Sequence, residues 1–296
     1  MTLFGPRPIG LALGSGAARG LAHIGVLKVL EAEGLEPDAI AGTSIGAMIG
    51  ALFAAGTPAA DIERIALELD ISSLMGLGEV AFTRGAVFAG DKVTAFLRTH
   101  LPATFEELII PFGCVATDLT RNRPVRFTEG DLVGAVRASI SVPLAFLPVT
   151  MDDMLLVDGY VSEPVPVSLA RHLGGRTIVA VPVSGAGTVT LTDATGLGEV
   201  RRMREVRAAI RSGEPYERGS GALEILGAVS EAFEGRLAEP AVRTASVVIA
   251  PDVARFGAFE FGQAARLIAE GEVAARAVVP ALRRKARRAA TPRHPA

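Results

Sequence analysis

The segment 42–46, Gly-Thr-Ser-Ile-Gly, has the G-x-S-x-G spacing of a nucleophile elbow, a sharp turn that joins a strand to a helix. Gly42 and Gly46 avoid the collisions that side chains two positions from Ser44 would make in so tight a turn. The turn would lift the Ser44 hydroxyl above the sheet, at the N-terminus of the next helix, where peptide N–H groups favour developing negative charge. The spacing therefore predicts a serine nucleophile for acyl transfer. The alternative is a packing turn with an inert serine, because so short a pattern also arises by chance in a chain rich in glycine.

A second glycine-rich stretch also joins a predicted strand to a predicted helix. It consists of Gly14, Ser15, Gly16, Ala17, Ala18, Arg19 and Gly20. One interpretation is a dinucleotide-binding loop, but that pattern needs glycine where Arg19 stands and an acidic residue where the second strand ends in Ala41 and Gly42. We favour an oxyanion hole, in which exposed glycine N–H groups bind the tetrahedral intermediate. Arg19 would then hold the loop or an anionic head group.

A nucleophilic serine needs a base, and the histidines are poorly placed for that role. They are His23 on the first predicted helix, His100 and His172 at helix ends, and His294 in the tail. Asp158 is placed better, because it ends a predicted strand and begins an Asp-Gly loop. An aspartate with an ordinary pKa of about 4 is a weak base, so the oxyanion hole would have to supply much of the rate. The alternative is that Asp158 is an ordinary turn residue.

The elements that carry these residues alternate between strand and helix. Residues 9–13 form a short apolar run, and residues 21–33 place leucine and isoleucine on one helical face. Residues 35–41 form a second strand that leads into Ser44 and a helix to about residue 55. This order predicts a parallel sheet covered by helices on both faces. Only one strand precedes the elbow strand, which departs from the topology of ordinary α/β-hydrolases.

The remaining elements are predicted from hydrophobic periodicity and from the glycine and proline residues that end helices and strands. They are helices within 61–100, strand 109–117, helix 131–139, hairpin 147–157, helix 167–173, strand 177–183, helices within 197–212 and 220–237, strand 245–250, and a helix from about 260. A glycine-rich break at 76–90 predicts a surface loop, and a polar insertion at about 184–220 predicts a mobile lid or loop. We expect one domain, 1–296, with a basic tail at 283–296.

The composition is that of a globular protein, with 49% hydrophobic and 21% charged residues. The net charge of −2 gives no case for nucleic-acid binding. The longest weakly polar run, Ile45 to Ala60, falls short of the roughly 20 apolar residues of a membrane-spanning helix. Cys114 is the single cysteine, which excludes an internal disulfide and suits a reducing compartment. No His or Cys spacing is typical of a metal site. We therefore expect a cytoplasmic protein without metal or cofactor.

Basic residues gather near the C-terminal end of the chain. They are Arg283, Arg284, Lys285, Arg287, Arg288 and Arg293. One interpretation is a solvated helix end. The other is a weak attraction to the anionic inner face of a membrane, worth about 1 kcal/mol per basic residue near such a surface. The sequence does not determine the oligomeric state.

Four blocks together resemble the patatin-like phospholipase family, in particular its bacterial cytosolic members related to the catalytic domain of neuropathy target esterase. The blocks, in order, are Gly14 to Gly20, Gly42 to Gly46, Arg137-Ala138-Ser139-Ile140-Ser141-Val142-Pro143, and Asp158-Gly159 followed by Pro164-Val165-Pro166. They cover roughly residues 8–185, and their common order makes them more specific together than any one block alone.

The resemblance implies a three-layer α/β/α fold with a mostly parallel sheet. It also implies hydrolysis of phospholipid, lysophospholipid or simple acyl esters by a Ser/Asp dyad, without a catalytic histidine or a metal. Ser44 would be the nucleophile and Asp158 the proton acceptor. The backbone of the Gly14 loop, chiefly Gly16 and Ala17, would form the oxyanion hole. An acyltransferase that uses the same dyad and a non-catalytic regulator on the same fold stay open as alternatives.

Two positions depart from the family's usual pattern. Tyr160 follows Asp-Gly where a second small residue is usual, and Glu163 stands where asparagine is common. Tyr160 would narrow the pocket or lie in a lid, so the departure bears on the substrate more than on the mechanism. Ser139 and Ser141 are expected to shape the loop beside the dyad.

Overall fold

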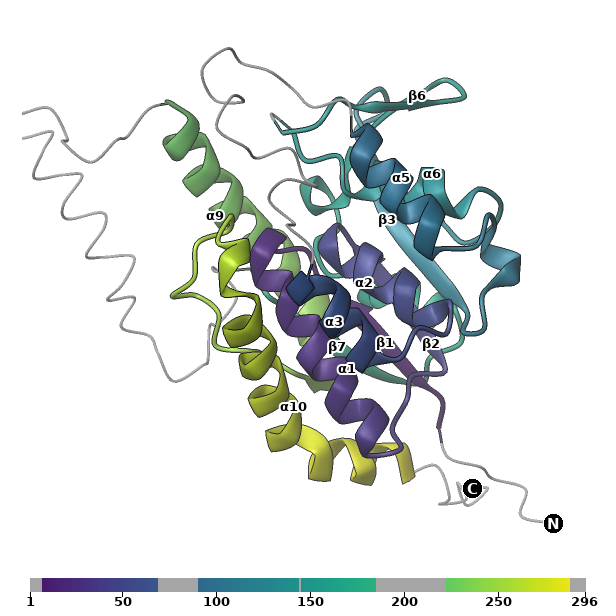
Figure 1. The fold of residues 1–296 in the computed structure, drawn as a ribbon, viewed down its shortest axis with the longest axis vertical. Helices are drawn as coiled ribbons and strands as arrows, with labels where there is room; N and C mark the ends of the chain where they lie inside the picture. The colour runs from purple at the N-terminus through teal and green to yellow at the C-terminus, as the bar shows by residue number, and fades with distance from the viewer. Residues whose placement is uncertain (1–6, 69–89, 144, 185–221, 288–296) are drawn as a thin grey trace, which may run out of the picture.

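The computed structural model describes residues 7–68, 90–143, 145–184 and 222–287. These residues build one eight-stranded sheet with helices on both faces (Figure 1), which confirms the predicted α/β/α fold.

The sheet has the strand order β5-β6-β3-β2-β1-β7-β8, and β4 pairs with β3 off this path. The strands are β1 Ile9–Leu13, β2 Ala39–Thr43, β3 Phe112–Asp118, β4 Arg123–Phe127, β5 Val149–Met151, β6 Met154–Asp158, β7 Thr177–Val181 and β8 Val247–Val248. The five strands β3, β2, β1, β7 and β8 are parallel, whereas β4, β5 and β6 join by antiparallel pairing. The mostly parallel sheet follows from the strand-helix alternation of the sequence.

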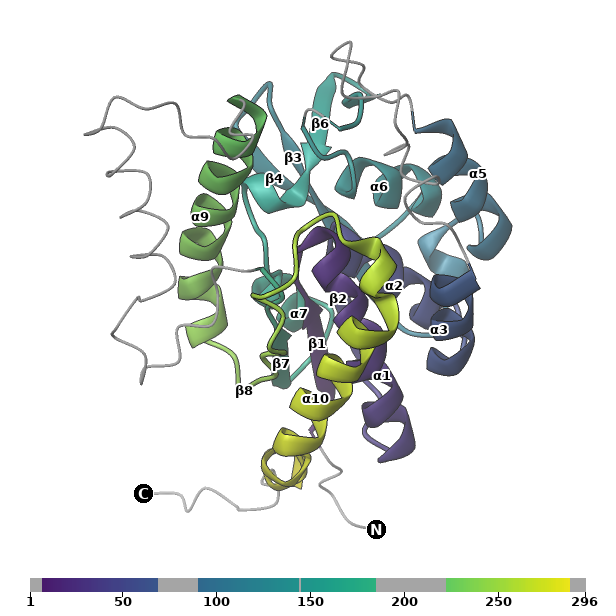
Figure 2. The same ribbon diagram turned by 60° about the vertical axis from the view of Figure 1, so that its left-hand side comes forward.

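The helices are α1 Ala22–Ala32, α2 Ile45–Ala54, α3 Ala59–Glu68, α5 Asp91–His100, α6 Leu132–Ser139, α7 Val167–His172, α9 Ala222–Arg243 and α10 Ala264–Arg287. The described residues also form short 3-10 turns, namely η1 Ala17–Leu21, η2 Phe105–Glu107, η3 Gly159–Val161 and η4 Phe261–Gln263. Figure 2 shows α10 lying along α1, far from it in the sequence. No helix in the described ranges is both long and apolar enough to cross a membrane.

Alternation along the central strands divides the core into two layers. Leu11 and Leu13 pack with α1, α2, α3 and α10 on one face of the sheet. Ala12, between them, packs with α7 and with Ala238 of α9 on the other face. Because side chains alternate across a strand, a continuous apolar run such as Ile9–Leu13 supplies both layers at once.

The carboxyl ends of β1 and β2 meet at one edge of the sheet, because the two strands are parallel and Leu13 pairs with Gly42. Strand β3 continues past this edge, since Thr43 at the end of β2 pairs with Val115. Strand β6 pairs antiparallel with that overhang and ends at Asp158, opposite Ala116. Asp158 therefore reaches the edge from the opposite direction.

In the C-terminal third, the observed helix boundaries differ from the predicted ones. The helix predicted to end at 237 runs on to Arg243 and includes Pro240, because Ala238 packs into the core and outweighs the local preference of proline. The last helix begins at Ala264 after a 3-10 turn. The predicted insertion at 184–220 and the break at 76–90 lie almost wholly outside the described residues, as does the tail after residue 287.

Candidate active site

Ser44 is the residue between β2 and α2, at the position where a nucleophile elbow places its serine. Its φ of 59° and ψ of −125° are a strained conformation for a residue with a side chain, worth roughly 1–3 kcal/mol. A Cβ at Gly42 would lie 2.5 Å from the Gly46 carbonyl oxygen, and one at Gly46 would lie 2.4 Å from that of Leu13. Both glycines are therefore required by close backbone contact, as the spacing predicts.

The Ser44 hydroxyl donates a hydrogen bond of 2.6 Å to Oδ2 of Asp158. The other carboxylate oxygen, Oδ1, accepts the N–H of Tyr160 at 2.9 Å. Asp158 is fully buried and Ser44 is 6% exposed. The structure thus brings the two predicted dyad residues, 114 positions apart in the sequence, into direct contact.

Burial raises the pKa of Asp158 to about 8, because removal from water penalises the charged carboxylate. The hydrogen bonds from Ser44 and Tyr160 oppose this shift, and the nearby charge of Glu234 adds to it. The ordinary pKa of about 4 expected for Asp158 from the sequence was wrong, because burial arises only in the folded protein. A carboxylate with a pKa near neutrality is a stronger base, and better matched to proton transfer.

Ser139 and Ser141, in the segment 137–143, hold the backbones of the two dyad residues by hydrogen bonds. Ser139 accepts the Ser44 N–H with its Oγ at 3.0 Å and donates its own proton to the Val115 carbonyl at 2.6 Å. The Ser141 carbonyl accepts the Asp158 N–H at 2.9 Å. Both serines act on backbone geometry, which agrees with the structural role expected for them.

The N–H groups of the glycine-rich loop divide into two sets. Those of Gly14, Ser15, Ala18 and Arg19 each donate to a backbone carbonyl. Those of Gly16 and Ala17 have no hydrogen-bond acceptor among the described residues, and Ala17 adopts a positive φ of 48°. Gly20 serves packing, because a Cβ there would lie 2.1 Å from Cγ2 of Ile45. Gly16 and Ala17, the two residues singled out by the resemblance, therefore have N–H groups available to bind an oxyanion directly.

His23 supports this loop from beneath. Its side chain is fully buried, and Nε2 lies 2.8 Å from the Gly14 carbonyl oxygen, which requires the proton on Nε2. Burial lowers the pKa of His23 to about 4, so the ring is neutral at ordinary pH. The structural role expected for His23 on its helix agrees with this geometry.

Arg19 is turned toward helix α9 and the segment after β8. Its Nε donates to the Phe256 carbonyl at 2.6 Å, and its Nη1 lies 3.2 Å from Glu231. The side chain is 8% exposed. Of the two roles considered for Arg19, this geometry favours holding the loop.

Helix α9 also contacts the site in ways that sequence reasoning missed. The Ser15 hydroxyl hydrogen-bonds Oε1 of Glu234, which is buried. Tyr160 accepts a hydrogen bond of 2.8 Å from Ser230 at its hydroxyl, so it faces α9 and does not line the pocket described below. The sequence offers no signal for these contacts, because α9 reads only as a helix far from the four blocks.

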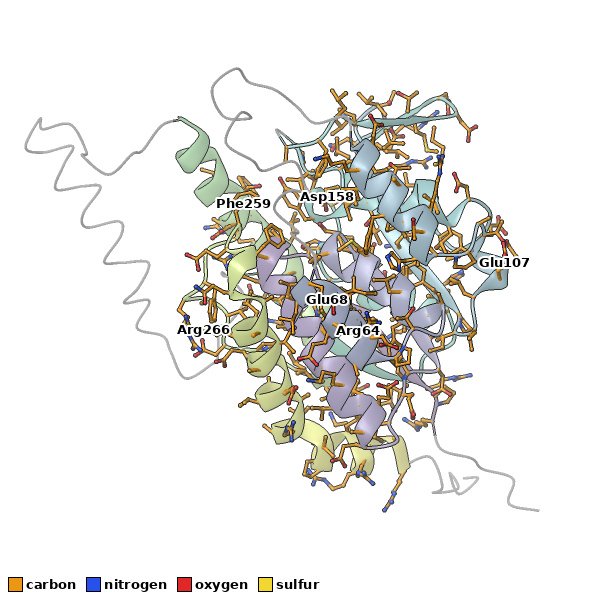
Figure 3. All side chains as sticks on the ribbon, viewed as in Figure 1. Arg64, Glu68, Glu107, Asp158, Phe259 and Arg266 are labelled. Atoms are coloured by element: carbon orange, nitrogen blue, oxygen red, sulfur yellow. The ribbon has the colours of Figure 1, made fainter. Side chains whose placement is uncertain are left out.

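An apolar pocket with a volume of about 60 Å³ opens beside the Ser44 hydroxyl. It is lined by Ala17, Ser44, Ile45, Met48, Ile140, Val142, Ala145, Phe146, Phe259 and Phe261. Figure 3 marks Asp158 and Phe259, which lies in the segment before η4. The described residues contain no group of three or more His, Cys, Asp or Glu side chains that could hold a metal.

The sequence pattern of the patatin-like phospholipase family matches residues 11–171, a span that contains the elbow, the glycine-rich loop and Asp158. The chain belongs to the patatin-like phospholipase family. Within this family it is 34% identical over 187 residues to an uncharacterized NTE family protein of Mycobacterium bovis, covering 63% of this chain and 52% of that protein.

Other relatives are much longer proteins. The chain is 34% identical over 198 residues to patatin-like phospholipase domain-containing protein 6 of Mus musculus, covering 64% of this chain and 14% of that protein. It is 33% identical over 183 residues to lysophospholipase NTE1 of Mycosarcoma maydis, covering 59% of this chain and 10% of that one. The crystal structure of VipD from Legionella pneumophila has the same fold, with a TM-score of 0.53 at 14% identity, over 93% of this chain and 67% of VipD.

Proposed function

We propose that this patatin-like protein is a serine esterase that hydrolyses acyl esters of lipids, as a phospholipase A or lysophospholipase. The observation that carries the proposal is the 2.6 Å hydrogen bond from Ser44, which lines an apolar pocket, to the buried carboxylate of Asp158. Such a pocket suits a fatty acyl chain, and the dyad suits attack on its ester carbonyl.

The proposed reaction proceeds through an acyl-enzyme. Oγ of Ser44 attacks the ester carbonyl carbon as Oδ2 of Asp158 takes the hydroxyl proton. The N–H groups of Gly16 and Ala17 donate to the oxyanion, and Asp158 passes the proton to the leaving alcohol. A water molecule, deprotonated by Asp158, then attacks the acyl carbon and releases the fatty acid, and the proton returns to Ser44.

The test uses two substitutions and one probe. Ser44→Ala and Asp158→Asn should each lower turnover of a short-chain aryl ester by at least about a thousandfold, because each removes a group that takes part in bond making. A fluorophosphonate should label the wild type at Ser44. Ser168→Ala, at an exposed serine of α7, serves as the control and should keep full activity and labelling.

The outcomes separate the competing functions. Full activity in Asp158→Asn would exclude the dyad. Absence of labelling under all conditions would favour a non-catalytic regulator. Transfer of the acyl group to added lysolipid or glycerol, in preference to water, would favour an acyltransferase.

Peripheral contact with an anionic membrane is a second, weaker part of the proposal. Within α10, Arg283 pairs with Glu33 and Lys285 donates to the Ser246 carbonyl, so these two cations are engaged by the protein itself. Co-sedimentation with vesicles containing anionic lipid, at low and at high salt, tests whether the basic end adds binding.

A further inference from the structure

Helix α9 lies outside the span matched by the family pattern, yet its side chains reach both halves of the candidate active site. Ser230 donates to the hydroxyl of Tyr160, two residues after the proposed base. Glu231 pairs with Arg19, and Glu234 binds the Ser15 hydroxyl. Residues 230, 231 and 234 lie within one turn on the same side of the helix, so all three contacts come from one face.

Glu234 is the unusual member of this set, because a carboxylic side chain seldom lies 8% exposed without a strong reason. Its partner Ser15 directly precedes Gly16 and Ala17, the two residues whose N–H groups are proposed to bind the oxyanion. Ser15 is also tied to the segment after the dyad base, through its N–H to the Pro164 carbonyl at 2.9 Å.

We propose that Glu234 is a positioning residue for the active site, which fixes the oxyanion loop through Ser15 and places a second acidic group within electrostatic range of Asp158. The proposal rests on the proposed esterase function and extends it to a helix that the family pattern does not cover. One side chain, that of Glu234, would then act on both the glycine-rich loop and the proposed base Asp158.

The hydrogen bonding supports two states of this contact. When Glu234 is ionised, the Ser15 hydroxyl must donate to it, because a carboxylate only accepts. When Glu234 is protonated it donates to Ser15, whose own proton then turns to the Pro164 carbonyl at 3.3 Å. Ser15 stays bound in both states, and protonation adds a link to the segment that follows Asp158.

Neighbouring side chains act on the Glu234 carboxyl group, and its charge acts in turn on Asp158 and Tyr160. Burial raises the pKa of Glu234 to about 7; the charge of Glu231 on the same helix adds to the rise, whereas Ser15 and Arg19 of the loop and η1 oppose it. Asp158 of β6 and Tyr160 of η3 each feel the charge of Glu234, which raises their pKa values. Deprotonation of Glu234 therefore opposes ionisation of Asp158.

The substitution Glu234→Gln separates the charge from the contact. Glutamine has the same length and still accepts from Ser15, but it carries no charge. Asp158 should then ionise at lower pH, so the acidic limb of the kcat/KM profile should move down by about 0.5–1 pH unit. A residue with a purely structural role would change the height of this profile and leave its limb in place.

Glu234→Asp makes the opposite separation, since it keeps a charge but is too short to hold Ser15. We expect a fall in kcat of about tenfold or more, with the acidic limb within about 0.3 unit of wild type. Glu239→Gln is the matched control, on the same helix but paired with Arg243 at the surface, and should match wild type in both respects.

The experiment measures kcat/KM and fluorophosphonate labelling from pH 5 to pH 9 for the wild type and the three variants, with circular dichroism to check folding. An unmoved limb in Glu234→Gln, or a wild-type kcat in Glu234→Asp, would overturn the role of Glu234 and leave the esterase proposal standing. If Glu234→Gln does not fold, Glu234→Asp alone decides the positioning role. A wild type without hydrolysis or labelling would overturn both proposals.

Discussion

Ser44 and Asp158 are set in place by neighbours that serve geometry and not chemistry. Ser139 holds the Ser44 backbone, and the Ser141 carbonyl holds that of Asp158. Thr117 adds a hydrogen bond of 3.0 Å to the Asp158 carbonyl. With its backbone fixed and its side chain sealed from water, Asp158 has a pKa far from that of a free aspartate.

Asp158→Asn should make the folded protein more stable at pH 8 than the wild type. The pKa of the folded carboxyl, about 8, lies above the unfolded value of about 3.9, so the folded state holds the proton more tightly. Wild-type stability contributed by this group is complete below about pH 4 and is lost as the pH rises toward 8. Asparagine does not ionise, so thermal melts between pH 5 and 8 should show a flatter dependence.

The control for that measurement is Asp252→Asn, whose carboxylate is 73% exposed. It should follow the wild-type pH dependence. Identical curves for Asp158→Asn and the wild type would contradict the raised pKa of the buried carboxyl.

His23→Gln should keep turnover within about tenfold of the wild type. The ring donates to the Gly14 carbonyl, and a glutamine amide can donate in its place. A general base at this position would instead cost about 10²–10⁴ in rate, so steady-state kinetics on an aryl ester separate a dyad from a triad. His172→Gln, at the exposed end of α7, is the control.

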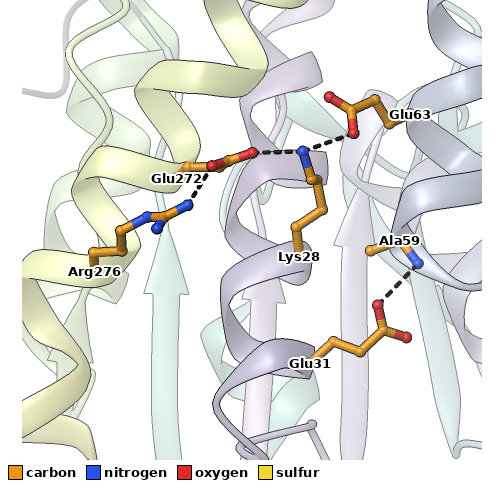
Figure 4. Close-up of polar contacts among 6 residues, drawn as sticks. All are labelled: Lys28, Glu31, Ala59, Glu63, Glu272 and Arg276. Atoms are coloured by element: carbon orange, nitrogen blue, oxygen red, sulfur yellow. Dashed lines mark hydrogen bonds and ion pairs between the residues drawn. The ribbon is translucent and has the colours of Figure 1, made fainter.

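At the scale of elements, the contact between α1 and α10 fixes the helix that starts beside the glycine-rich loop 14–20. Gly25 and Gly271 let the two backbones approach, because a Cβ at either would lie 1.9 Å from a carbonyl oxygen of the opposite helix. Lys28 of α1 joins the same contact by pairing with Glu272 of α10 and with Glu63 of α3 (Figure 4). The contacts between α1 and α10 join residues more than 200 positions apart in the sequence.

Gly25→Ala and Gly271→Ala should each destabilise the fold by about 1–3 kcal/mol, because the added methyl group forces the helices apart. Chemical denaturation measures the change in unfolding free energy. Gly262→Ala, where no atom lies within 4 Å of the added Cβ, should be close to neutral. A neutral Gly25→Ala would show that α10 is not packed on α1 as described.

At the scale of the whole molecule, the pocket is assembled from segments that are distant along the chain. Lining side chains come from the glycine-rich loop 14–20, from helix α2, from residues 140–146 and from residues 259–261. Its volume of about 60 Å³ is several times the roughly 10–15 Å³ that a cavity needs to hold one water molecule. The described walls therefore fit a short acyl chain, or the first carbons of a longer one.

Met48→Ala should move the preference among aryl esters toward longer acyl chains, because it removes side-chain volume from the pocket wall. The measurement is kcat/KM over a series of chain lengths from two to about twelve carbons. Met154→Ala, on β6 and away from the pocket, should leave the preference unchanged. An unchanged preference in Met48→Ala would mean that the acyl chain lies elsewhere.

The sequence by itself determined the local geometry of this site. Gly42 and Gly46 predicted the elbow because only glycine fits beside so tight a turn, and Asp158 stood out because it ends a strand in front of glycine. The alternation of strands and helices gave the fold class, because periodicity is a property of neighbouring residues.

Only the tertiary structure decided which of these residues come into contact and how burial changes their chemistry. The antiparallel return of β6 brings Asp158 to Ser44, and burial, which depends on all surrounding layers, shifts its pKa. The contact of Glu234 with Ser15 spans 219 positions and follows from the packing of α9 alone. Such long-range proximity leaves no periodic trace in the sequence, because it is set by the packing of elements and not by their local propensity.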